Sequence, residues 1–128
     1  RNACFNRWYK RSNKKMRIFL ILILTPIIFS SENEINKAWC SSIDGNDQFI
    51  TKYGTYVDCL TNEYAIEAEF DYKWKEAIGQ SLHYAEATNK KAGILLIKTK
   101  KSKKDYYNEM MNVINKYNLP IKVFLIDE

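Results

Sequence analysis

The 128 residues suffice for one domain, and with 46% apolar and 27% charged residues they exclude a disordered chain, a collagen-like repeat and a membrane protein with many spans. The formal net charge is +5, yet seven of the 20 basic residues and none of the 15 acidic residues lie in residues 1–30. Residues 31–128 therefore hold 13 basic and 15 acidic residues, a net charge of −2. The overall basic balance thus does not by itself indicate a nucleic-acid binder.

The first 30 residues are typical of an export signal. The apolar run 18–29 (IFLILILTPIIF) is too short to cross a bilayer, which takes about 20 residues, and has the length of a signal-peptide core. We expect Met16 to be the translation start, with residues 1–15 upstream of it. Residues 31–128 would then form one exported domain, periplasmic or secreted, with no membrane span after cleavage. The alternative is a buried N-terminal helix or an uncleaved anchor.

Helices and strands are expected to alternate through residues 31–128. Ser31 and Glu34 have the spacing of a capping box at the start of the first helix, and Asp71 is expected to cap the second. The apolar run 94–97 is typical of a strand buried on both faces. We expect helices over 31–42, 72–88 and 104–118 and strands over 48–52, 55–60, 64–70, 94–97 and 121–126. This order predicts an α/β fold with a mixed sheet flanked by helices.

Cys40 and Cys59 are the two cysteines of the expected mature domain. An even number of cysteines in a small exported domain permits one disulfide. Such a bridge would close a loop of about 20 residues and contribute about 3 kcal/mol. The alternative is a pair of buried free thiols.

Three carboxylates lie on the two strands expected to form the second hairpin. Asp58 is near the end of one strand, and Glu67 and Glu69 share a face of the next. Carboxylates that converge in this way make an oxygen-rich site suited to Mg²⁺ or Mn²⁺. The alternative is an ordinary solvated face of an edge hairpin.

The following helix carries a polar stripe, and a lysine-rich segment follows the buried strand. Lys73, Gln80 and Tyr84 are spaced to share one side of the helix, whereas His83 faces elsewhere and is expected to be solvated or at the rim. Five lysines fall within seven residues: Lys98, Lys100, Lys101, Lys103 and Lys104. They would suit nucleic-acid phosphates, although such runs are more often solvated loops that keep a small domain soluble.

Taken together, these motifs resemble the PD-(D/E)XK nuclease superfamily. The pattern Gly54-x-x-x-Asp58, Glu67-x-Glu69 and Gln80-x-x-x-Tyr84 is similar to its RecB-type branch, and also to short bacterial members that carry signal peptides. The resemblance implies a restriction-endonuclease-like α-β-β-β-α-β core with an extra C-terminal helix and strand.

The resemblance also implies roles for individual residues. Asp58 and Glu67 would hold the metal, and Gln80 and Tyr84 would orient the site. Position 69, where the superfamily has its catalytic lysine, is Glu69 here. Lys73 would then act from the helix in its place, and Glu69 would add a metal ligand or a contact with a second metal. The acid of the first helix would be Glu34 or Glu32.

Three functions follow as hypotheses. The first is an exported, Mg²⁺-dependent nuclease that hydrolyses phosphodiesters, with the metal activating a bound water. The second is a catalytically inactive nuclease fold that binds nucleic acid or protein, which the missing lysine favours. The third is a disulfide-linked structural domain. Nuclease activity would be lost in a chelator, whereas a binding module would keep its affinity.

Overall fold

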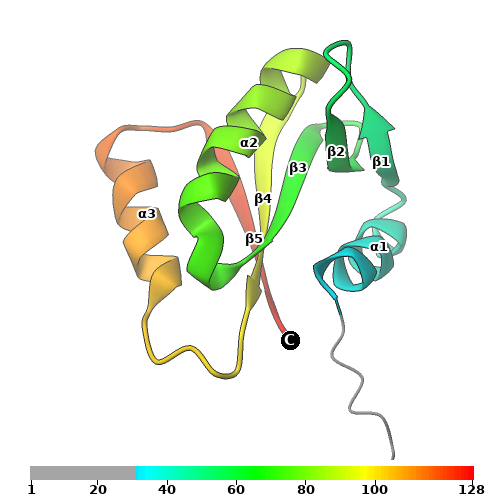
Figure 1. Ribbon diagram of the computed structural model, residues 1–128. Coiled ribbons are helices and arrows are strands. Elements are labelled where there is room, and N and C mark those ends of the chain that lie inside the picture. The colour runs from blue at the N-terminus through cyan, green and yellow to red at the C-terminus, as the bar shows by residue number, and fades with distance from the viewer. Residues whose placement is uncertain (1–30) are drawn as a thin grey trace, which may run out of the picture.

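The computed structural model describes residues 31–128 (Figure 1). The expected signal segment, with Met16, lies outside the described residues. The described elements are the helices α1 (Glu32–Ser42), α2 (Trp74–Thr88) and α3 (Tyr106–Lys116), the short 3-10 turn η1 (Asp71–Lys73), and the strands β1 (Asn46–Ile50), β2 (Tyr56–Leu60), β3 (Tyr64–Phe70), β4 (Lys91–Lys98) and β5 (Ile121–Asp127). None of these helices combines the length and apolar character that a membrane crossing requires.

The five strands form one mixed sheet in the order β1-β2-β3-β4-β5. β1, β2 and β3 are antiparallel, whereas β4 runs parallel to both β3 and β5. The α/β class and the mixed sheet flanked by helices are therefore confirmed. The finer prediction of a restriction-endonuclease-like core is not.

The helices cover both faces of the sheet, with α1 on one side and α2 and α3 on the other (Figure 1). On the α1 side, Cys40 packs with Ile66, Ala68, Leu95 and Ile97. On the opposite side, Ile94 and Leu96 pack against Trp74 and Ala77 of α2 and Met110 and Ile114 of α3. β4 supplies residues to both cores, which is why its sequence is apolar without alternation.

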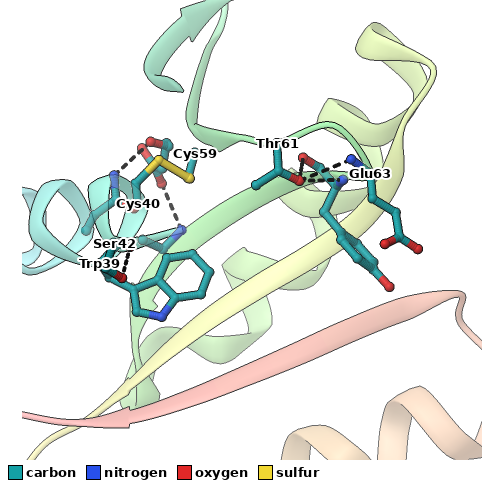
Figure 2. Close-up of a disulfide and its surroundings, with 10 residues drawn as sticks. Trp39, Cys40, Ser42, Cys59, Thr61 and Glu63 are labelled. Atoms are coloured by element: carbon teal, nitrogen blue, oxygen red, sulfur yellow. Dashed lines mark hydrogen bonds between the residues drawn. A yellow bond between two sulfur atoms is a disulfide. The ribbon is translucent and has the colours of Figure 1, made fainter. Parts of the chain in front are cut away.

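A disulfide between Cys40 and Cys59 joins α1 to β2, as Figure 2 shows. Both cysteines are fully buried. Close beside them, the Asn36 side-chain amide donates to the Asp58 carbonyl oxygen at 2.8 Å. The predicted bridge is thus confirmed, and α1 is held against the strand that carries Asp58.

Some element boundaries differ from the sequence prediction for local reasons. α2 begins at Trp74 rather than residue 72, because residues 71–73 form the η1 turn. Asp71 is not a helix cap: its buried carboxylate accepts a hydrogen bond from the Thr99 hydroxyl at 2.9 Å. β4 starts three residues earlier than expected, at Lys91, where the backbone of Lys91 donates to the Glu63 carbonyl oxygen.

Candidate functional site

The candidate site begins where β2 separates from β3. The register joins these strands only through Cys59–Ile66 and Leu60–Ala65. Beyond that point the backbone amide of Ala68 in β3 donates to a side chain instead of to the β2 backbone: its acceptor is Asp58 Oδ2, at 2.9 Å. Asp58 is therefore turned toward β3, where the sequence places two glutamates.

Glu67 is the most buried member of this group, with only 4% of its surface exposed. Burial, and next the neighbouring charge of Asp58, raise the pKa of Glu67 from 4.5 to about 9. Burial likewise raises the pKa of Asp58. Within residues 31–128, Glu67 Oε2 has no hydrogen-bond partner. Asp58 and Glu67 thus face one another as a pair that favours holding a proton at neutral pH.

Glu69 is also buried, but it has a cationic partner. Lys73 Nζ lies 3.2 Å from Glu69 Oε1, and the Phe70 amide donates to the same oxygen at 3.0 Å. This ion pair raises the pKa of Lys73. Lys73 therefore forms the ion pair with Glu69, and no cation within residues 31–128 is paired with Asp58 or Glu67.

A fourth carboxyl group joins the cluster from α1, and it is Glu32 rather than Glu34. Burial, and next a hydrogen bond with Glu69, raise the pKa of Glu32 to about 8. Glu34 instead closes the capping box, since its Oε2 accepts from the Ser31 amide at 2.9 Å. Sequence reasoning named both acids and could not choose between them, because the choice depends on where α1 docks on the sheet.

The polar residues of α2 lie partly at this cluster. Tyr84 is buried, its hydroxyl donates to Gln80 Oε1 at 3.4 Å, and burial together with the charge of Glu67 raises its pKa above the ordinary value. His83 lies at the rim as expected, where Nε2 is 3.2 Å from the Thr55 hydroxyl and the ring stacks on Tyr53. Tyr84 therefore reaches the acidic cluster from α2, and Gln80 is joined to it through the Tyr84 hydroxyl.

The expected metal centre is not seen in the described part of the chain. In residues 31–128, no group of three or more His, Cys, Asp or Glu side chains is arranged to hold a metal ion. Asp58, Glu67 and Glu69 are close, but Glu69 is engaged by Lys73 and the other two acids favour a shared proton. This chemistry differs from a ready set of three ionised oxygen ligands.

The lysine-rich segment lies at a different place, at the carboxyl ends of the parallel strands. Two cavities adjoin it, of about 830 Å³ and 260 Å³. Lys103 and Lys104 line both cavities, Lys101 lines only the larger one and Lys98 only the smaller one, whereas Lys100 lines neither. The structure thus turns four of the five predicted lysines toward hollows in the surface.

Over 120 residues the chain is 31% identical to the protein named "Putative KilA-N domain-containing protein L33" of Acanthamoeba polyphaga mimivirus. The match covers 92% of this chain and 47% of the relative, so the chain spans about half of the relative's length. No family model matches the chain. No solved structure matches it either.

This similarity corrects the family expected from the motifs. The relative is named for a KilA-N domain, which is a different fold from PD-(D/E)XK. The predicted PD-(D/E)XK membership and the nuclease function drawn from it are therefore wrong. The motif did not identify the family, because many α/β domains can have two acids on a hairpin and a Gln-x-x-x-Tyr pair on a helix.

Proposed function

We propose that residues 31–128 form a nucleic-acid-binding module. The observation that carries the proposal is the gathering of lysines around two cavities at one edge of the sheet. Residues 98–104 contain five lysines and no acidic residue, in a domain whose net charge is −2. Positive charge is thus concentrated in residues 98–104, where it would attract the phosphates of a nucleic acid. The viral relative is named for a KilA-N domain, a DNA-binding fold, and this similarity supports nucleic acid as the partner.

The position of these lysines agrees with a binding role. In open α/β sheets, ligands bind outside the carboxyl ends of the parallel strands. Lys98 ends β4, and the loop that follows it leads into α3. The loop therefore projects from the edge where such folds hold their ligands.

Salt-dependent binding by the full chain tests this proposal. A fluorescein-labelled 20-base-pair duplex and its single strand are titrated by anisotropy between 50 and 300 mM KCl, with and without EDTA. We expect binding in both buffers. Replacing Lys98, Lys103 and Lys104 with Gln should weaken binding. It should also reduce the slope of log K against log salt concentration for the duplex by about 2 to 3, because each phosphate contact contributes about 0.9.

The matched control removes three exposed lysines elsewhere: Lys37, Lys75 and Lys116. This control lowers the net charge by the same amount but keeps the lysines that line the cavities. It should therefore leave most of the affinity and of the salt dependence intact. Equal loss in both triple variants would show that only net charge matters. Absence of binding at 50 mM KCl would refute the proposal.

We also propose that Mg²⁺ or Mn²⁺ binds beside Asp58 and Glu67 by displacing the proton that this pair favours, with Glu69 as a third oxygen donor once it parts from Lys73. The support for this is Glu67 Oε2, which is buried and lacks a partner within the described residues. Calorimetry with each metal, beside an Asp58→Asn variant and a Glu63→Gln surface control, tests it. Saturable binding that is lost only in the Asp58 variant is expected, and no binding at millimolar metal would contradict it.

We propose that the domain is exported to an oxidising compartment, periplasmic or extracellular. The support for this is the buried Cys40–Cys59 disulfide, a bond that persists mainly outside the reducing cytosol. N-terminal sequencing of the chain recovered from the periplasm or medium of an expressing bacterium tests the proposal. A start near Ser31 is expected, whereas retention of the intact chain in the cytosol with free thiols would refute it.

A further inference from the structure

The larger cavity has the size of a nucleotide site. Its volume of about 830 Å³ falls within the range of small-molecule sites in proteins, which is roughly 300–1,000 Å³. Its walls come from the start of α1, the end of β3, the loop between β4 and α3, and the last residue, Glu128. In Figure 1, the loop, the C-terminus and the start of α1 lie at the same end of the molecule.

Three aromatic rings line this cavity. Phe70 and Tyr72 are stacked with their planes 6° apart and their centroids separated by 5.8 Å, and Tyr106 is contributed by the start of α3. Tyr72 is 51% exposed, so much of its surface remains open to another group. A flat base that stacks on such a ring gains affinity without regard to sequence, because every base has an aromatic face.

Cationic groups occur beside these rings. Lys101, Lys103 and Lys104 line the same cavity, and Lys104 Nζ lies 6.0 Å from the centroid of the Tyr106 ring. Glu128 also belongs to the wall, and its carboxylate can accept from the N–H groups that every base carries on its Watson–Crick edge. Rings, ammonium groups and acceptors within one hollow match the base, the phosphate and the base edge of a single nucleotide.

We propose that this cavity binds one unstacked nucleotide of a single-stranded nucleic acid. The inference rests on the proposed function and deepens it by naming the substrate class. A base within a duplex is stacked on both faces and cannot enter a hollow lined by aromatic rings, whereas a base in a single strand is free to do so. The lysines then hold the phosphates on either side of the bound base.

The inference is tested by comparing single-stranded with duplex DNA, and the wild type with variants that lack the Tyr72 ring. The full chain is titrated by anisotropy with labelled (dT)12 and with a 12-base-pair duplex at 100 mM KCl. We expect (dT)12 to bind at least fivefold more tightly than the duplex. Tyr72→Ala should weaken (dT)12 binding by roughly 5- to 150-fold, the range for losing one stacked base, and leave duplex binding unchanged. Tyr72→Phe keeps the ring and should retain the affinity.

The control is Tyr56→Ala on β2, since Tyr56 is 53% exposed, does not line the cavity and should leave binding unchanged. Circular dichroism establishes that each variant is folded. If the duplex binds as tightly as (dT)12 and Tyr72→Ala has no effect, the inference is overturned while the proposed function stands. If neither nucleic acid binds at 100 mM KCl or when the salt is lowered to 50 mM, the proposed function itself fails, and the inference fails with it.

Discussion

Replacing Glu67 with Gln is expected to stabilise the protein at alkaline pH and to remove part of the pH dependence of its stability. The pKa of Glu67 is about 9 in the folded protein and 4.5 in its ordinary state, chiefly because the side chain is buried. Between these two values the folded state binds a proton that the unfolded state has released. The free energy of unfolding must therefore fall as the pH rises through this window.

The size of the effect follows from the number of protons. When the folded state binds one proton more than the unfolded state, the free energy of unfolding falls by about 1.4 kcal/mol for each pH unit, or roughly 3 kcal/mol between pH 6 and pH 8. The substituted glutamine side chain would resemble the neutral acid in shape and would bind no proton. The variant should therefore lose about this much of the pH dependence, while the pKa of about 8 at Glu32 leaves a smaller dependence in both proteins.

Thermal unfolding followed by circular dichroism, in metal-free buffer containing EDTA at pH 5, 6, 7 and 8, measures this difference. The wild-type Tm should fall with pH, by about 4–8 °C for each kcal/mol in a domain of this size. Glu63→Gln is the control: Glu63 is exposed and paired with Lys91, which lowers its pKa, so it should behave as wild type above pH 6. An equal slope for Glu67→Gln and wild type would show that Glu67 is ionised in the fold and would refute the reasoning.

Three further predictions concern the packing of the domain. A Cβ at position 45 would overlap the sulfur atoms of both Cys40 and Cys59, so Gly45→Ala should cost about 1–3 kcal/mol in urea unfolding; a smaller loss would mean that the turn moves easily. Reducing the disulfide, which links residues 19 apart, should cost about 3 kcal/mol, measured by urea unfolding with and without dithiothreitol. Met110→Ala, at a fully buried position between α3 and the sheet, should cost about 2–5 kcal/mol by the same assay, and an unchanged midpoint would place Met110 outside the core.

Local patterns in the sequence were enough to predict most of the helices and strands. The alternation over 64–70 matches β3, and the apolar run 94–97 lies within β4. These features are local, because a strand or a helix face repeats over a few residues. The pairing of Cys40 with Cys59 was also within reach, since residues 31–128 contain no other cysteine.

The tertiary structure decided which polar groups meet. Glu32 joins the acidic cluster and Glu34 does not, because the docking of α1 on the sheet brings only one of them to Glu69. Asp71 is buried against Thr99 instead of capping a helix, a contact between residues 28 positions apart. Spacing along the chain carries no information about such distances.

The same limit explains why the family and the binding surface could not be read from motifs. The acids and the Gln80–Tyr84 pair do lie together, but a polar cluster in an α/β fold does not identify one superfamily. The larger cavity combines Tyr72, Tyr106 and lysines of the loop between β4 and α3, and these residues come from separate segments of the chain. Residue types and periodicity determined the elements, whereas packing of distant segments determined which side chains share a cavity, because only folding brings them within contact distance.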